Sequence, residues 1–466
     1  MFKKNISRIV FLLVATNTLQ SCFVAKDYKR HEALSEANFR SDQLPKDSIS
    51  LGDVSWRELF TDAALVSYIE EGLQNNLDIR MAMQHITTAN AYYQQGKAGY
   101  LPTLGIQGQV THQELSSNSQ FGSVFDGSIT QYELTGNLSW EADIWGKIRS
   151  SKRASEAAYL QTVAAHQAVK TQLIADIATV YYQLLTLDAQ MQIVEKTITN
   201  RSNGLETTVA LKEAGILTEV AVKQTEAQLY TAKSLRIDIQ RDIALAENRL
   251  SILLGTTPKP IERGTLEAQD LAPQLKTGYP SGLLRNRPDV IAAEYQLVEA
   301  FELTNIARSN FYPSLRITAN GGFQSVELDQ LLSANSLFAT FVGSLVQPLL
   351  NGRKIKTNYE VAQSQQEIAY LQFKQTLLNA SREVSDALYT FTAADKKIGF
   401  TTKEFEAYDL ATSYSEELLD NGIANYLEVL NARENALSSE VRITTTRFAQ
   451  LQAVVALYRA LGGGVE

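Results

Sequence analysis

The sequence has almost no cysteine and very little histidine. One Cys and four His occur among 466 residues, and no two histidines lie at the spacing of metal ligands. A single Cys cannot form an intrachain disulfide or a multi-cysteine zinc or iron-sulfur site. We therefore expect no metal centre, no cofactor and no histidine-dependent catalysis, and no motif of an enzyme active site is present.

Excess positive charge is also missing. Lys and Arg number 43 against 51 Asp and Glu, which gives a net charge of −8. This removes the electrostatic basis for nucleic-acid binding. The hydrophobic content of 44% is too high for a disordered chain, and the length exceeds that of one ordinary compact domain. Two repeated units or one elongated architecture remain.

Proline, the strongest helix breaker, is absent from two long tracts. The sequence has nine prolines, none of them between Pro102 and Pro258 and none after Pro348. Within these tracts apolar residues recur every three or four positions, as in a coiled coil. In the first tract they are Val169, Leu173, Ile177, Val180, Leu184, Leu187, Met191, Val194 and Ile198. A helix from about residue 147 to 211 would be roughly 95 Å long at ~1.5 Å per residue.

A different period precedes each helical tract. Apolar and polar residues alternate over 104–111 and 132–141, and again over 315–324, which predicts β-strands with one apolar and one polar face. A fourth strand near 338–347 alternates poorly and is expected mainly because the chain is duplicated. Polar loops around 116–128 and 327–336 suit the ends of two hairpins.

Short matches in the same order reveal that duplication. Leu101-Pro102-Thr103-Leu104 corresponds to Tyr312-Pro313-Ser314-Leu315, and Gly146-Lys147-Ile148 to Gly352-Arg353-Lys354-Ile355 with a slip of one residue. Gly215-Ile216 corresponds to Gly422-Ile423, and Leu254-Gly255 to Leu461-Gly462. The nearly constant offset indicates a tandem duplication of the whole pattern.

The first residues have the layout of a bacterial lipoprotein signal. Lys3, Lys4 and Arg8 precede an apolar run over 9–15, and Leu19-Gln20-Ser21-Cys22 follows. The run is too short to span a bilayer. We expect cleavage after residue 21 and acyl chains on Cys22, which would tether the chain to a membrane. A buried, unmodified Cys22 is the alternative.

If the strands enter a membrane, they must close into a barrel, because lipid cannot satisfy an open sheet edge. Four strands are too few for a barrel of one chain. Two copies would give a filled eight-stranded barrel, and three would give a twelve-stranded barrel with a channel. A soluble sheet packed on helices would show the same alternation and stays open.

Motifs spread over nearly the whole mature chain resemble one family. In order they are WRELF at 56–60, NNLD at 75–78, YLP at 100–102, LSWEADIWGK at 138–147, RPDV at 287–290, AAE at 292–294, FYP at 311–313 and NGIANYLEVL at 421–430. Together they are similar to the TolC/OprM-like outer-membrane factors, in the lipoprotein branch that serves resistance-nodulation-division (RND) efflux pumps. The resemblance implies a mainly α fold with a β part: a long α-helical coiled-coil barrel, plus two β-hairpins per chain in a twelve-stranded trimeric transmembrane barrel.

The resemblance also implies an organisation of the chain. Residues 1–21 would be the signal peptide, 22–58 a lipidated extended segment, 59–255 the first efflux repeat, 256–280 a linker and 281–466 the second repeat. The partners would be two further copies, outer-membrane lipid, a periplasmic adaptor and an inner-membrane RND transporter.

Six further residues receive roles. Gly215 and Gly422 lie where each long helix must reverse, and a glycine C-cap is the plain interpretation. In the family these tips, with Ile216 and Ile423, form the tunnel mouth and the adaptor contact. Glu428 and Asn431 share a helix face, and family members often carry acids there that attract cations. Because Asn431 is neutral here, we expect a weaker selectivity ring, or simply an exposed Glu428.

The leading hypothesis is a passive outer-membrane export duct for small molecules. The alternatives are the exit duct of a protein-secretion system and a surface-tethered coiled-coil scaffold without a pore. The sequence does not identify the substrate.

Overall fold

The computed structural model describes residues 24–30, 54–116, 118, 120, 127–269, 286–423 and 425–464. The expected lipid-bearing Cys22 lies outside these residues. Contacts divide the chain into two compact units. Unit 1 takes residues 1–31, 86–162 and 293–373, and unit 2 takes 32–85, 163–292 and 374–466. Each unit combines segments from both halves of the sequence, so neither unit is a single repeat.

The described chain is mainly helical with one small sheet. This confirms the predicted class of a mainly α fold with a β part. The elements in chain order are α2 (Trp56–Leu59), α3 (Ala63–Asn75), α4 (Leu77–Ala98), β1 (Thr103–Glu114), β2 (Ser128–Ala142), α5 (Lys147–Glu213), α6 (Glu219–Leu253), α8 (Pro288–Ser309), β3 (Ser314–Ser325), two 3₁₀ turns (Leu328–Gln330 and Ala334–Ser336), β4 (Leu337–Val346), α9 (Lys354–Asp420) and α10 (Tyr426–Ala460).

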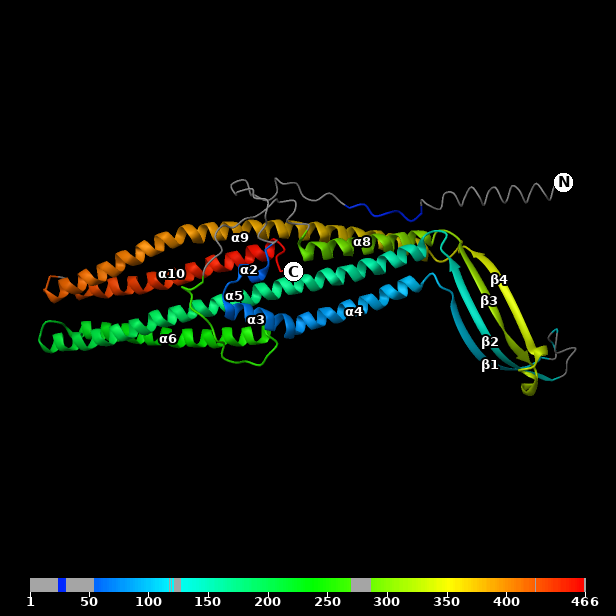
Figure 1. Ribbon diagram of the computed structural model, residues 1–466, viewed down its shortest axis with the longest axis horizontal. Coiled ribbons are helices and arrows are strands. Elements are labelled where there is room, and N and C mark those ends of the chain that lie inside the picture. Colours follow the sequence, from blue (N-terminus) through cyan, green and yellow to red (C-terminus); the bar gives the residue numbers. More distant parts are fainter. Residues whose placement is uncertain are drawn as a thin grey trace. The chain divides into compact units, whose positions relative to one another are not determined.

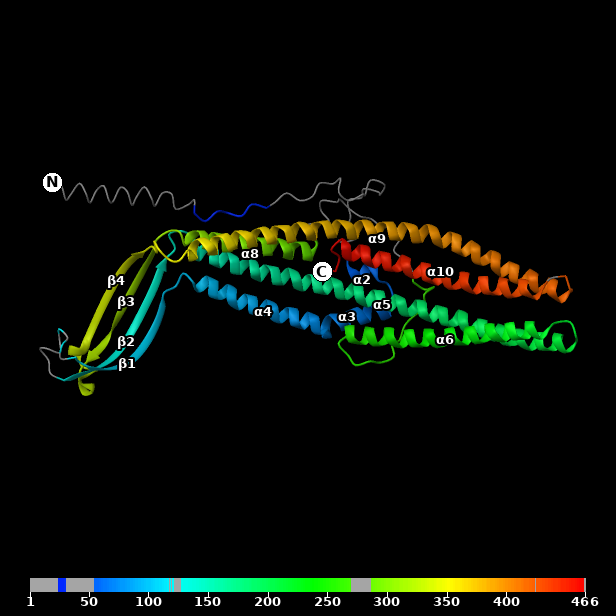
Figure 2. The ribbon, with the colours of Figure 1, turned by 180° about the vertical axis from the view of Figure 1, so that it is seen from behind.

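Equal element lengths confirm the duplication. Helices α4 and α8 each have 22 residues, β1 and β3 each have 12, α5 and α9 each have 67, and α6 and α10 each have 35. In both repeats a short helix, two strands and a long helix with its antiparallel partner follow one another. Figures 1 and 2 show α6 running back along α5 and α10 running back along α9.

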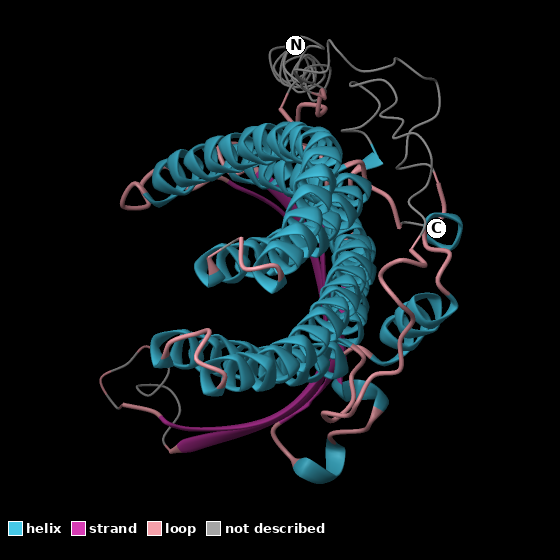
Figure 3. Cartoon of the chain, turned by 90° about the vertical axis from the view of Figure 1, so that its left-hand side faces the viewer, coloured by secondary structure: helices cyan, strands magenta, loops and turns pink. Residues whose placement is uncertain are grey.

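Unit 1 contains the sheet, whose strands are ordered β1-β2-β3-β4 and are all antiparallel (drawn magenta in Figure 3). The register aligns Leu104 with Leu138, Leu138 with Ala319, and Ala319 with Phe341. Because side chains alternate along a strand, these residues share one face. The opposite face carries polar residues, such as Gln109, Glu133 and Gln324. Strand β4 is present although its alternation is weak.

An extended segment over residues 24–30 lies against α5 and α8 in unit 1. The Lys26 amide donates to Asn305 Oδ1 at 3.2 Å, and Asn305 Nδ2 donates to the Lys26 carbonyl at 2.9 Å. Asp27 forms an ion pair with Arg153 of α5 at 2.8 Å. An added Cβ at Gly146 would lie 2.9 Å from the Cβ of Ala25, so this segment covers the turn where α5 begins.

Unit 2 contains the main hydrophobic core. Trp56, Ile177, Tyr181, Leu250 and Tyr458 are each at most 1% exposed and belong to one cluster. Of these residues, Ile177 belongs to the apolar seam predicted for residues 169–198. Full burial of side chains of this size is worth about 2–3 kcal/mol each. The cluster joins α2 and α3 to the long helices.

In each repeat, the glycine after the last helix lies close to the backbone just before another helix, α4 in the first repeat and α8 in the second. Gly255 and Gly462 have positive φ angles of 72° and 85°. An added Cβ at Gly255 would lie 2.5 Å from the carbonyl oxygen of Asn75, and one at Gly462 would lie 3.0 Å from that of Asn286. Glycine therefore lets the end of α6 pass α4, and the end of α10 pass α8.

Candidate functional site

Helix α5 ends in a tight turn built on Gly215. The Gly215 amide donates to the Lys212 carbonyl at 3.0 Å, and the Ile216 amide donates to the Leu211 carbonyl at 2.9 Å. Gly215 has a φ of 76°, the left-handed conformation that glycine adopts without strain. This is a Schellman-type helix end. The predicted glycine C-cap is confirmed here.

Helix α9 ends in the same way. The amides of Gly422 and Ile423 donate to the carbonyls of Leu419 and Leu418, both at 2.9 Å, and Gly422 has a φ of 72°. No described atom lies within 4 Å of an added Cβ at Gly215 or Gly422. The backbone angle, and not a lack of space, therefore requires glycine at both turns.

The isoleucine that follows each glycine points into solvent. Ile216 is 68% exposed and Ile423 is 74% exposed. Behind the turns, Ala221, Tyr426 and Leu430 form a small buried cluster with Leu217 and Leu419 packed against it. The α5–α6 and α9–α10 hairpins, whose turns face the viewer in Figure 3, therefore touch behind their tips.

Glu428 and Asn431 are both exposed on α10, one turn apart. The Asn425 side chain accepts a hydrogen bond from the Leu427 amide at 3.1 Å and caps the helix. Glu428 lies in the first helical turn, where the helix dipole favours an acid. The neighbouring Val429 and Leu430 are buried, so Glu428 and Asn431 occupy the face of α10 that faces away from this core.

A buried hydroxyl group connects the two hairpins. The Tyr426 hydroxyl on α10 contacts the hydroxyl of Thr208 on α5 at 3.3 Å and forms a short hydrogen bond with the hydroxyl of Thr225 on α6. Exposure is 7% for Tyr426, 2% for Thr208 and 1% for Thr225. Both threonines also donate to carbonyls of their own helices, so the network is locally satisfied. Sequence patterns do not predict this network, because periodicity within one segment does not identify a polar partner on another helix.

Arg201 makes a second connection. Its side chain is only 3% exposed, and its guanidinium lies 2.8 Å from Glu434 of α10 and donates to the Gln228 carbonyl of α6 at 2.6 Å. One buried cation on α5 thus contacts a helix of each hairpin. Removing one partner of such a pair leaves an uncompensated buried charge, which makes the contact costly to break within an intact fold.

A polar cavity of about 500 Å³ lies beside these contacts. Its lining includes Lys196 and Gly204 of α5, Asp409 of α9, and Arg433 and Glu440 of α10. An added Cβ at Gly204 would lie 2.8 Å from Nη1 of Arg433, so glycine makes room for that arginine. Burial raises the pKa of the Glu440 carboxyl, and the negative charge of Asp409 adds to this, while Lys196 acts in the opposite direction.

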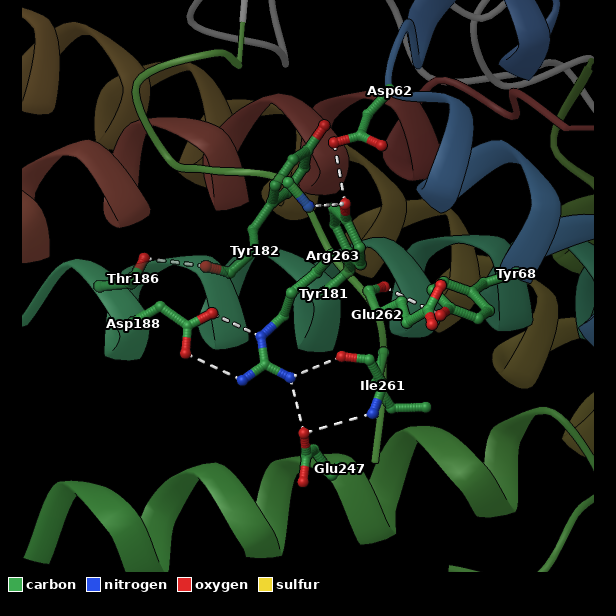
Figure 4. Close-up of polar contacts among 11 residues, drawn as sticks. Asp62, Tyr68, Tyr181, Tyr182, Thr186, Asp188, Glu247, Ile261, Glu262 and Arg263 are labelled. Carbon is green, nitrogen blue, oxygen red and sulfur yellow. Dashed lines mark hydrogen bonds and ion pairs between the residues drawn. The ribbon is translucent and has the colours of Figure 1, made fainter. Parts of the chain in front are cut away.

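A larger cluster of ionised groups lies farther along unit 2 and has a structural role. Figure 4 shows Arg263 of the loop after α6 between Asp188 of α5 and Glu247 of α6. Its Nε atom lies 2.5 Å from Oδ2 of Asp188, and its Nη1 atom lies 2.6 Å from Oε1 of Glu247. The hydrogen bond to Asp188 raises the pKa of the guanidinium further above its usual value. Nearby, the Tyr181 hydroxyl donates to Asp62 at 2.8 Å. Because each charge has a partner, this cluster fixes the loop to the helices.

The described residues hold no group of three or more His, Cys, Asp or Glu side chains arranged to bind a metal ion. None of the described helices combines the length and the apolar content needed to cross a bilayer. Met81 and Met83 of α4 are 54% and 48% exposed, so they do not belong to the core of the chain.

Comparison with known proteins decides the family. The family model "Outer membrane efflux protein" matches residues 68–256 and 279–463. The chain belongs to this family. Among curated relatives, the solvent efflux pump outer membrane protein SrpC of Pseudomonas putida is 29% identical over 96% of each chain. The cation efflux system protein CusC of Escherichia coli strain K12 is 28% identical over 96% of this chain and 97% of its own.

Solved structures agree in fold. A crystal structure of CusC aligns with a TM-score of 0.85 at 26% identity, covering 94% of this chain and 99% of the other. The outer-membrane channel OprN aligns with a TM-score of 0.88 at 22% identity, covering 95% and 100%. The predicted family, the outer-membrane location and the export function are thereby confirmed. Channels of this family form trimers and work with an adaptor and an inner-membrane transporter. The family is one of transport proteins, not of enzymes.

Proposed function

We propose that three copies of this outer membrane efflux protein join their sheets into one twelve-stranded barrel, which is the exit of an export duct. The exposed apolar face of the sheet is the observation that carries this proposal. Leu104 is 71% exposed, Ile106 81% and Phe341 80%, and β1 and β4 have no outer partner strand among the described residues. Such a face suits lipid, and lipid tolerates no open edge.

The number of copies follows from geometry. With strands ~4.8 Å apart and tilted by ~40°, an eight-stranded barrel is roughly 16 Å across its backbone and a twelve-stranded one roughly 24 Å. Side chains fill the first and leave a passage in the second. The polar face, with Gln109, Glu133 and Gln324, would line that passage.

The long helices support the same assembly. On α6, Val220, Tyr230, Ile237, Leu245 and Ile252 are 56–65% exposed and recur every seven to ten residues. Such a stripe is the seam of a coiled coil that lacks its partner. The unit 2 part of α9 carries a second set of exposed apolar residues, among them Leu378, Tyr389, Phe400 and Tyr414. Neighbouring copies would cover both helices in a helical tunnel.

The hairpin tips would then be the periplasmic end of the duct. We assign adaptor contact to Gly215, Ile216, Gly422 and Ile423, because both isoleucines are exposed on rigid turns. The contacts of Tyr426 and Arg201 would hold the hairpins together in the closed duct. Opening requires these contacts to exchange for others, at a cost that the partners must supply.

Exposed Glu428 would meet its two counterparts at the entrance and favour cations, with Asn431 as a neutral neighbour. At the other end, residues 1–21 would be cleaved and Cys22 acylated. Val24 is buried, and its carbonyl accepts a hydrogen bond from Arg308 of α8 at 3.4 Å. In the same proposal, residues 22–58 are the lipidated extended segment, 59–255 the first efflux repeat, 256–280 a linker and 281–466 the second repeat.

The cargo would be small molecules, moved passively. SrpC is named for a solvent efflux pump and CusC for a cation efflux system, so relatives of one fold serve different cargoes. We infer that cargo is chosen by an inner-membrane transporter of the RND class, with a periplasmic adaptor between it and the tips.

The decisive experiment is the mass of the purified mature protein. In detergent we expect a particle of three copies, and in planar bilayers we expect ion conductance. A stable particle of one copy in buffer without detergent or lipid would overturn the proposal and favour a coiled-coil scaffold.

A further inference from the structure

The turn between β4 and α9 is uncovered. Leu349 and Leu350 are 89% and 98% exposed. No described atom lies within 4 Å of an added Cβ at Gly352. Two adjacent leucines this exposed are unusual on a protein surface in water, where large apolar patches mark an interaction site.

The equivalent turn of the first repeat is closed by the chain itself. The Asp143 carboxylate accepts hydrogen bonds from the amides of Ile148 and Arg149, both at 2.8 Å. Ala25 covers Gly146. Among the described residues, the second turn has neither such a carboxylate on its helix start nor a segment that covers its glycine.

Three cations, Arg353, Lys354 and Lys356, lie within six residues after the leucines. Arg353 is 3.0 Å from Glu360, and Lys356 is 3.9 Å from the same carboxylate. Lys354 forms no ion pair among the described residues. Glu360 thus pairs with two of the three cations, and the charged residues between 349 and 360 sum to a net charge of +2.

The backbone of this turn is strained. Arg353 has a φ of 68° and is the only described non-glycine residue with a positive φ. Such strain persists where a structure gains from it elsewhere, and it is frequent at binding sites. Here the strained residue is itself a cation, three positions after Leu350.

We propose that Leu349, Leu350, Arg353, Lys354 and Lys356 form a docking surface for an anionic phospholipid of the outer membrane. The leucines would enter the acyl region, and the cations would bind the headgroup phosphate. The inference rests on the proposed barrel. The docking surface follows β4 in the chain, and β4 itself carries exposed apolar residues: Phe341 and Leu345 are 80% and 67% exposed. A lipid satisfies both halves of the surface, whereas a soluble phosphate would leave the leucines in water.

Native mass spectrometry tests this with the detergent-purified trimer and equal amounts of phosphatidylglycerol and phosphatidylcholine. We expect preferential retention of phosphatidylglycerol. The variant R353Q/K354Q/K356Q should lower the ratio of retained phosphatidylglycerol to phosphatidylcholine about tenfold or more, since each basic side chain at an anionic surface contributes about fivefold. The variant L349S/L350S should reduce retention of both lipids.

A matched control is K396Q/K397Q/K403Q, which removes the same charge from exposed positions farther along α9. We expect it to retain lipid as the unmodified protein does. An unchanged lipid ratio in R353Q/K354Q/K356Q would overturn the inference. So would displacement of phosphatidylglycerol by inorganic phosphate with no effect of L349S/L350S, which would indicate a soluble anion.

The trimer itself provides the last distinction. If L349S/L350S dissociates the trimer and still retains phosphatidylglycerol, the leucines face a neighbouring copy, and the lipid inference fails. A trimer that shows no lipid preference defeats this inference alone. Failure to form any trimer in detergent defeats the proposed function.

Discussion

The hydroxyl group of Tyr426 is one of the contacts between the two hairpins. Its hydroxyl contacts Thr208 and Thr225, which belong to the other hairpin. Tyr426→Phe removes that oxygen and keeps the ring in its cluster. The threonines keep their carbonyl partners, so we expect a loss of about 1 kcal/mol, or about fivefold in the closed-to-open ratio. Single-channel recordings should show more frequent opening.

Tyr414→Phe is the matched control, because Tyr414 lies on α9 and is 60% exposed. It should leave the channel unchanged. Equal opening of both variants would remove the role assigned to Tyr426.

Glu440 gives the contact region a pH dependence. Burial raises the pKa of its carboxyl above the usual value for glutamate, so the folded state binds the proton more tightly than the unfolded state does. Ionisation therefore destabilises the fold: stability is full below pH ~4.5 and falls as the pH rises through the higher folded pKa. Glu440→Gln should raise the thermal midpoint at neutral pH, and the gain should disappear in acid.

Scanning calorimetry at several pH values measures this, with the exposed Glu406→Gln on α9 as the control. A gain of Glu440→Gln that is the same in acid and at neutral pH would contradict the explanation.

At the scale of elements, the hairpin turns depend on backbone conformation. Gly422 has a φ of 72° and open space around it. Gly422→Val should strain the turn by about 1–3 kcal/mol and displace Ile423, because a β-branched residue avoids this region. Folding of the long helices should survive, and cross-linking to the adaptor in cells should be lost.

Gly422→Asn separates conformation from bulk, since Asn tolerates positive φ. It should retain most of the cross-linking. If Val were tolerated as well as Asn, the turn would not be the contact surface.

Arg287 fastens the start of α8 to two other helices. Its guanidinium contacts Glu383 of α9 at 2.8 Å and donates to the Ala460 carbonyl of α10 at 3.0 Å, with only 7% of the side chain exposed. Arg287→Ala removes a donor from the Ala460 carbonyl and leaves Glu383 with Arg459 alone, and it should cost about 1–3 kcal/mol in denaturant unfolding. Arg459→Ala, which removes a more exposed cation from the same Glu383, should cost about 1 kcal/mol or less. Equal losses would argue against the burial explanation.

At the scale of the whole molecule, the selectivity role proposed for Glu428 depends on the proposed trimer. Three copies would bring three exposed carboxylates to one opening. Glu428→Gln should reduce the preference for cations over anions in reversal-potential measurements. Asn431→Asp should increase it, because it restores a second acid one turn away. An unchanged preference in both variants would assign Glu428 to the solvated surface.

How far the sequence predicts this molecule depends on the range of the interaction. Local rules were sufficient for the helix from Lys147, for the glycine turns at Gly215 and Gly422, and for three of the strands. The duplication supplied β4. Contacts across long separations are not predicted: Arg287 and Tyr426 enter only as parts of family motifs, and Arg201 enters in none. Their partners lie on other helices, and no periodicity in one segment reveals them.

The division into units was missed for a related reason. The repeats are visible along the chain, but packing combines the first repeat with the second in both units. Sequence similarity records how the chain arose, whereas burial follows which apolar surfaces meet.

The two helical hairpins have the same helix lengths, with 67 residues in α5 and in α9 and 35 residues in α6 and in α10. These equal lengths restrict how this protein can change in size. One additional residue in α5 would rotate all that follows by about 100° and advance it by about 1.5 Å. The apolar residues of α5 beyond the insertion would then no longer face α6. Lengthening is open to this architecture in steps of about seven residues, added to both arms of a hairpin together. Evolution of such ducts should therefore proceed by paired insertions and deletions, and single ones should be confined to the loops.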